Sequence, residues 1–224
     1  MRIFAAAITS MLATGALADN NEIFINQLGN SNAVGSASTP ATQDGTRNTM
    51  QFTQRGHSNG IGLDANATNA LQGALQEGDR QTMEVTQPGN RNLARRLEQD
   101  GGDRNEMFVR QSGNDNLLSL LRQNGDKNDA SVIQSGNQNN GSARQVGDNN
   151  ILTVLQSGHR NDFDILSGDF GVNGRPGSCF SCDVTLTQSG NDNYANVWQQ
   201  DTNQMATITQ SGHGNAAYTM QSAN

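Results

Sequence analysis

The 224-residue chain is 33% hydrophobic, 16% charged and 4% aromatic, whereas 29 Asn, 21 Gln and 25 Gly together make up a third of it. This composition excludes an ordinary globular enzyme core, which needs nearer half apolar residues. It leaves either disorder or a fold with an unusual core. The net charge of −7 and the lack of a basic run argue against nucleic acid as the primary partner.

Residues 1–18 are predicted to be a secretory signal peptide. Met1 and Arg2 form a short basic start, an apolar run from Ile3 to Leu12 follows, and Ala16-Leu17-Ala18 is an A-x-A cleavage site. No later stretch approaches 18 apolar residues, so we expect no membrane-spanning helix.

A repeat dominates residues 19–224. Its unit is Gln-x-Gly-x-x-Asn followed by an alternating stretch that ends on the next Gln. From Gln111 the glutamines recur at 123, 134, 145 and 156, and after a gap they recur at 188, 199, 210 and 221. Such self-similarity at a fixed period is the signature of a repeat architecture.

Each unit predicts one strand and one turn. From Asn to Gln, small or apolar side chains occupy alternate positions, as in Asn128–Gln134 and Asn150–Gln156, which is typical of a half-buried strand. Between strands, x-Gly-x-x forms a tight arc in which Gly supplies positive φ. We therefore predict an all-β fold, a β-solenoid of about nine two-strand coils with parallel stacked sheets, degenerate around 38–48, 65–76 and 167–182.

In a solenoid, equivalent residues lie above one another at ~4.8 Å, so inward amides can form ladders that satisfy their own hydrogen bonds. The predicted core ladder comprises Gln27, Gln54, Gln87, Asn105, Gln111, Asn116, Gln123, Asn128, Gln134, Asn139, Gln145, Asn150, Gln156, Gln188, Asn193, Gln199, Gln210, Asn215 and Gln221. The predicted turn glycines are Gly29, Gly56, Gly89, Gly113, Gly125, Gly136, Gly147, Gly158, Gly190 and Gly212.

Some units depart from the pattern. Ala65 and Ser167 occupy Gln positions, and Asn92–Gln99 and Asn116–Gln123 each carry one extra residue, most simply a bulge.

The repeat resembles that of the curlins, the subunits of bacterial curli fibres, which reads Ser-x5-Gln-x-Gly-x2-Asn-x-Ala-x3-Gln. Residues 105–116 (NEMFVRQSGNDN) are similar to it with Asn in place of Ser, and residues 182–199 (CDVTLTQSGNDNYANVWQ) include the Ala and the second Gln. The resemblance implies a secreted functional amyloid, a major subunit or a nucleator, whose coils stack end to end into adhesive surface fibres. The implied partners are further copies, a second curlin-like subunit and an outer-membrane secretion channel.

Candidate chemistry is sparse, and we predict no catalytic, cofactor or metal site. His57, His159 and His213 each follow the arc Gly several coils apart, which favours turn residues over one metal site. Two thiols, Cys179 and Cys182, cannot close a four-ligand zinc site. Register places them at the arc Gly and Asn positions, and export favours a disulfide over free thiols. The pair Asp162 and Asp164 has no adjacent basic cluster.

Three hypotheses remain from the sequence. The first is a structural subunit or nucleator of an extracellular fibre, exported through the periplasm and serving adhesion and biofilm matrix. The second is a monomeric extracellular module that binds glycan, ice or a host protein through its repeat surface. The third, a solenoid enzyme acting on polysaccharide, needs an acid/base cluster that the sequence does not offer.

Overall fold

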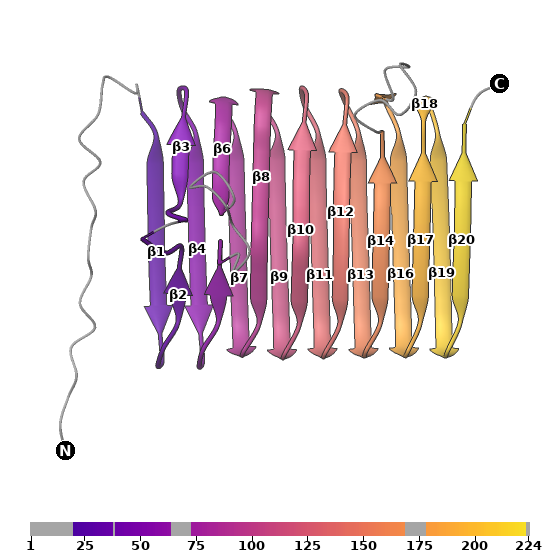
Figure 1. Cartoon of the computed structure of the whole chain (residues 1–224), viewed down its shortest axis with the longest axis horizontal. Helices are drawn as coiled ribbons and strands as arrows, with labels where there is room; N and C mark the ends of the chain where they lie inside the picture. The colour runs from indigo at the N-terminus through magenta and orange to yellow at the C-terminus, as the bar shows by residue number, and fades with distance from the viewer. Residues whose placement is uncertain (1–19, 38, 64–72, 169–177, 223–224) are drawn as a thin grey trace.

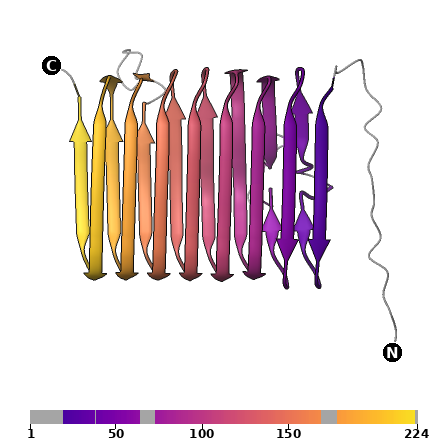
Figure 2. The same cartoon turned by 180° about the vertical axis from the view of Figure 1, so that it is seen from behind.

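The computed structural model describes residues 20–37, 39–63, 73–168 and 178–222. The described residues form strands and turns without a helix, and the strands stack in two parallel sheets along one axis (Figures 1 and 2). The predicted all-β solenoid is therefore confirmed. The predicted signal peptide, residues 1–18, lies outside the described residues and stays a prediction.

Sheet A contains eight strands in chain order, each parallel to the next. They are β1 (Glu22–Leu28), β4 (Thr49–Arg55), β7 (Thr82–Asn90), β9 (Glu106–Asn114), β11 (Asp129–Asn137), β13 (Ile151–His159), β16 (Asp183–Asn191) and β19 (Met205–His213).

Sheet B contains ten strands. They are β2 (Ala33–Val34), β3 (Thr42–Asp44), β5 (Gly60–Ile61), β6 (Ala74–Asp79), β8 (Leu93–Asp103), β10 (Leu117–Asn124), β12 (Asn140–Val146), β14 (Asp162–Ser167), β17 (Tyr194–Gln199) and β20 (Ala216–Gln221). A third, small sheet pairs β15 (Cys179–Phe180) with β18 (Asp201–Thr202).

The described residues form eight coils, one fewer than the sequence count. The difference arises in sheet B, where β5 pairs with the first half of β8 and β6 with its second half. The segments β5 and β6 are thus two halves of one interrupted strand in one layer, and β2 and β3 repeat this division in the layer before. Each such pair of segments therefore counts as one strand and does not add a coil.

The core is a single column between the sheets. Along β11 and β13 every second side chain is buried, and Val132 lies opposite Val154 in the next coil. Sheet B supplies the facing layer with Leu118 and Leu121. Adjacent layers compensate each other in size, since a Cβ on Gly141 would lie 2.0 Å from the ring of Phe163.

The predicted bulges are present. In β10 the register towards β12 shifts between Leu118 and Leu120, so Ser119 is the extra residue. Strand β8, which also carries an extra residue, pairs with β10 without a shift. The two irregular strands are neighbours, and each accommodates the bulge of the other.

The arc glycines are fixed by the next coil as well as by their own backbone. Gly136 has a φ of +104°, and a Cβ placed on it would lie 2.0 Å from the carbonyl oxygen of Gly158 in the following coil. Gly212, the arc glycine of the last described coil, has a matching φ of +105°, but a Cβ placed on it would meet only Asn215 Nδ2, at 3.8 Å. Stacking at the strand spacing therefore leaves no room for a side chain at the arc glycine.

We predict that Gly136→Ala lowers the free energy of unfolding by about 3 kcal/mol or more, because backbone strain adds to a clash with backbone atoms that cannot move apart. The control Gly212→Ala carries a matching positive-φ strain without the clash and is expected to cost about 1–2 kcal/mol. Denaturant unfolding of freshly purified monomer gives both values. Equal losses would show that backbone strain, not the stacking of coils, selects glycine at position 136.

Candidate functional site

One glutamine of each coil joins a continuous ladder along sheet A. Each side-chain Nε2 donates to the Oε1 of the glutamine in the next coil, as Gln111 does to Gln134 at 2.8 Å and Gln134 to Gln156 at 2.9 Å. The ladder runs through Gln27, Gln54, Gln87, Gln111, Gln134, Gln156, Gln188 and Gln210. All bonds point the same way, from the N-terminal coil towards the C-terminal coil.

Sheet B carries a second ladder with the same direction. Its bonds join Gln43, Gln76, Gln99, Gln123 and Gln145, and later Gln199 and Gln221. Ser167 interrupts it, as its place in the sequence predicts, and its Oγ lies 3.4 Å from Gln199 Oε1. The short hydroxyl replaces an amide in the middle of the row.

The second N–H of these glutamines ties the two sheets together. Gln134 Nε2 also donates to the backbone carbonyl of Leu117 in sheet B at 3.2 Å, and Gln145 Nε2 donates to that of Asp129 in sheet A at 3.0 Å. A buried amide that directs one N–H to the next coil and the other to the opposite sheet satisfies its donors fully. The glutamines therefore hold both the stack and the sandwich.

Asparagine ladders close the arcs. Along the arc that follows sheet A, Asn116 accepts a bond from the backbone N–H of Asn139 through Oδ1 at 3.1 Å, and its Nδ2 donates to the carbonyl of Gly136 at 3.0 Å. The same pair of bonds recurs at Asn32, Asn59, Asn92, Asn139, Asn161 and Asn193. The row ends at Asn215, whose backbone N–H donates to Asn193 Oδ1. Each asparagine therefore fixes the arc of the next coil.

The opposite arc contains Asn105, Asn128 and Asn150, and then Cys182 takes the next asparagine position. The backbone N–H of Cys182 donates to Asn150 Oδ1 at 3.0 Å, while Cys179 stacks above Gly147 in the glycine position. The two cysteines form a disulfide in the structure. Asn150 Nδ2 has no hydrogen-bond partner among the described residues, so this disulfide spans the arc at which the amide row ends.

Sequence reasoning missed several members of these rows. They are Asn32, Gln43, Asn48, Asn59, Gln76, Gln81, Asn92, Gln99 and Asn161. The motif QEGDRQ at residues 76–81 contains the signal, because it is the repeat with Gln in place of Asn.

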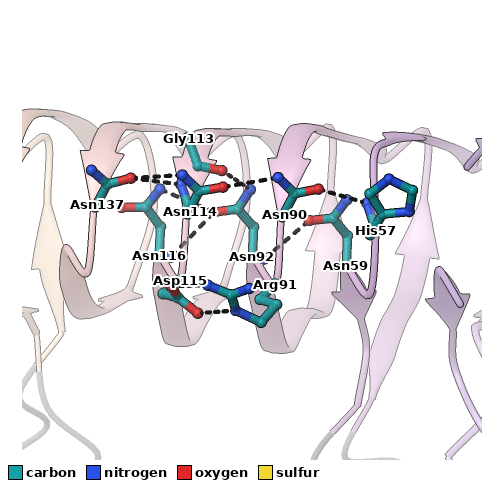
Figure 3. A network of polar contacts seen from close by, with 10 residues as sticks. All are labelled: His57, Asn59, Asn90, Arg91, Asn92, Gly113, Asn114, Asp115, Asn116 and Asn137. Carbon is teal, nitrogen blue, oxygen red and sulfur yellow. Dashed lines mark hydrogen bonds and ion pairs between the residues drawn. The ribbon is translucent and has the colours of Figure 1, made fainter. Parts of the chain in front are cut away.

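The three histidines lie on three different coils. They occupy an outer row on the arcs, one position after the glycine, which runs His57, Asn90, Asn114, Asn137, His159, Asn191 and His213. Figure 3 shows the row from His57 to Asn137. The backbone N–H of His57 donates to Asn90 Oδ1 at 3.0 Å, and His159 Nδ1 lies 3.3 Å from Asn137 Nδ2. The histidines therefore act as turn residues in this structure.

No three His, Cys, Asp or Glu side chains are grouped for metal binding within the ranges that the structure describes. On the outer face of β14, Asp162 accepts a bond from Asn140 at 3.0 Å and Asp164 accepts one from Ser142 at 2.8 Å. The described residues also contain no helix of the length and hydropathy needed to span a membrane.

Exposed charges pair across coils. Arg91 binds Asp115 through two bonds of 2.6 and 2.7 Å (Figure 3), and the guanidinium lowers the pKa of that carboxyl. Asp129 has the opposite environment, because desolvation and the neighbouring charge of Glu106 raise its pKa. Glu98 is buried on sheet B and forms ion pairs with Arg96 and Arg122.

Together, the ladders and stacked arcs define a class of protein, a parallel β-solenoid whose core is part aliphatic and part amide. The family model of the curlin associated repeat matches residues 102–136 and 125–158, which run from β9 to β13. These two matches support a curlin-family repeat protein. No curated protein and no solved structure matches the chain.

We predict that substitutions in the two glutamine ladders can either lower or raise the free energy of unfolding. Gln134→Ser should cost about 2–4 kcal/mol, since it leaves buried polar groups of Gln111, Gln156 and Leu117 unpaired. Ser167→Gln should gain about 1 kcal/mol by completing the interrupted row. Urea unfolding of the two variants measures the effect, and a destabilising Ser167→Gln would contradict the prediction.

The raised pKa of Asp129 gives a pH-dependent prediction. A carboxyl whose folded pKa exceeds its unfolded value destabilises the fold when charged, so Asp129→Asn should add up to about 0.5 kcal/mol at neutral pH. The gain should disappear as the pH falls below about 4, where both states are protonated. Asp115→Asn is the control with the opposite sign, because Arg91 lowers that pKa. Denaturant unfolding of both variants and the wild type at a series of pH values tests the prediction. A stability gain of Asp129→Asn that persists in acid would refute the electrostatic cause.

Proposed function

We propose that this curlin-repeat protein is the structural subunit of a secreted fibre, which grows when copies stack end to end through their terminal coils. The observation that carries the proposal is the direction of the two glutamine ladders. It is supported by the exposure of core-facing side chains at the N-terminal coil.

The ladders end in complementary groups. Within the described residues, Gln27 Oε1 receives no hydrogen bond, and Gln210 Nε2 donates only to the carbonyl of Tyr194 at 2.9 Å. Gln43 and Gln221 terminate the sheet B ladder in the same manner. An amide has two N–H donors, so the C-terminal coil offers a donor where the N-terminal coil offers an acceptor.

The terminal coils also match in register. Within one copy, Gln54 stacks on Gln27 and Gln210 stacks on Gln188. If a second copy continued this register, its Gln27 would stack on Gln210. Ile25 of that copy would then cover Ile208, and Ile23 would cover Ala206. Ile23 and Ile25 point along the core row but are 42% and 47% exposed, so stacking would bury apolar surface that one copy leaves in water.

Only head-to-tail stacking satisfies these groups. Two N-terminal coils facing each other would oppose acceptor to acceptor, and buried amides without partners are costly. Open strand edges without such constraints pair indiscriminately. The ladders therefore favour a polar fibre in which the solenoid continues from one copy into the next, and adhesion and biofilm matrix are the roles that such a surface fibre would serve.

Ile25→Lys tests the proposed contact, with Phe24→Lys as its matched control. Both residues lie on β1 and are similarly exposed, at 47% and 54%, but only Ile25 points along the core row. We expect Ile25→Lys to suppress assembly, because it buries a charge against Ile208, and Phe24→Lys to assemble. Thioflavin-T kinetics, electron microscopy and fibre diffraction with a ~4.7 Å meridional reflection are the measurements.

In a mixture with wild-type protein, a small fraction of Ile25→Lys should cap one fibre end and leave the other end growing, since its C-terminal coil is intact. Equal inhibition by both lysine variants would refute the docking geometry. Wild-type protein that stays monomeric and gives no ~4.7 Å reflection would refute the fibre itself.

A further inference from the structure

The tryptophan and both tyrosines of the chain gather on one patch of the outer surface. The sequence contains one Trp and two Tyr. Tyr194 and Trp198 lie on β17 and Tyr218 on the neighbouring β20, at the C-terminal end of sheet B (Figure 1). All three occupy positions that alternate with the buried ones, so they face away from the core. A chain with very few aromatic rings thus places its amphipathic ones together.

The patch is an array of three strands by three outward positions. Strand pairing sets Asp162, Asp164 and Leu166 of β14 beside Tyr194, Asn196 and Trp198 of β17, and these beside Ala216, Tyr218 and Met220 of β20. We call these nine residues the aromatic grid. The rings of Tyr194 and Tyr218 are 5.5 Å apart between centroids and tilted by 52°.

Polar groups fill the space between the rings. Asn196 Nδ2 lies 3.4 Å from the hydroxyl of Tyr194, and the carboxylate of Asp164 lies on the adjacent strand opposite Asn196. A pocket of about 110 Å³ opens at this point, lined by Asp164, Leu166, Asn196, Val197 and Trp198. The pocket has room for a small substituent, because one water needs only about 10–15 Å³ of such space.

This combination restricts the chemistry of a partner. A purely apolar partner would bury the carboxylates of Asp162 and Asp164 without compensation. A polyanion would meet these carboxylates and no cation within the grid. A second copy of the same face would set carboxylate against carboxylate. A ligand with flat apolar faces and many hydroxyl donors fits all nine positions, because aromatic faces accept C–H surfaces and carboxylates accept O–H donors.

We propose that the aromatic grid binds a β-linked hexopyranose polysaccharide. The sugar faces lie on Tyr194, Tyr218 and Trp198, hydroxyls donate to Asp164 and Asp162, and a ring substituent enters the pocket beside Trp198. The aromatic grid lies on the outer face of sheet B and not on a terminal coil, so binding to it does not depend on fibre formation. In a fibre it would recur once per subunit.

The single tryptophan makes the test direct. Cellohexaose and chitohexaose, as probes for glucan and aminoglucan chains, are titrated into the full-length monomer while Trp198 emission is recorded. Retention on insoluble cellulose and chitin is measured alongside. We expect saturable quenching by at least one hexaose, and the pair of probes distinguishes the substituent that the pocket accepts.

Tyr218→Ala and Asp164→Ala should each weaken binding about tenfold, as expected for losing one stacked ring or one charge-assisted acceptor. Met205→Ala is the matched control, because Met205 is 66% exposed on sheet A of the same coil as Tyr218, which is 75% exposed. Thermal unfolding of each variant confirms the fold. Unchanged emission with neither polysaccharide retained would overturn the proposal, as would equal weakening by Met205→Ala.

Discussion

The structure depends on one constraint: each coil repeats above the last at the strand spacing, so a side chain meets its own kind in the next layer. A buried glutamine is costly alone, yet in a column each amide has a partner above and below. Gln134 shows the full use of the group, since it accepts from Gln111 and donates both to Gln156 and to the backbone of the other sheet. The same repetition excludes a side chain at Gly136, because the next arc lies directly above it.

The constraint explains how a chain with so few apolar residues folds. Val132 and Val154 exclude water from a thin core, while the amide rows and arc asparagines give that core its order. One core ring, that of Phe163, is accommodated by a small neighbour in the adjacent layer, Gly141. The rest of the core is mainly aliphatic and Met side chains, and amides take over part of the stabilising role.

Much of the fold was predictable from the sequence, because the spacing of the glutamines determines the register of the strands. Strand positions, buried faces, a bulge within Asn116–Gln123 and the irregular Ser167 all follow from counting, although the place of the bulge at Ser119 does not. The number of coils did not follow, since an interrupted strand such as β5 and β6 counts twice in sequence and once in space. The hydrogen bond from each glutamine to the opposite sheet could not be predicted from the sequence. It joins residues of different sheets, and the spacing of glutamines does not specify which residues of the two sheets face each other.

Direction is the property that separates the amide ladders from the hydrophobic core. In the proposed stack of copies, apolar contacts between terminal coils would tolerate either end of a neighbour, whereas a row of amides has a donor end and an acceptor end. The direction of stacking is therefore selected by the amide hydrogen bonds and not by the apolar contacts. Each hydrogen bond contributes little net free energy, but leaving a buried amide without its partner is costly. The outward residues are released from this demand, because their polar groups can be satisfied by water. The outward positions are consequently those on which the fold can vary its surface chemistry, and Tyr194, Trp198 and Tyr218 lie on them.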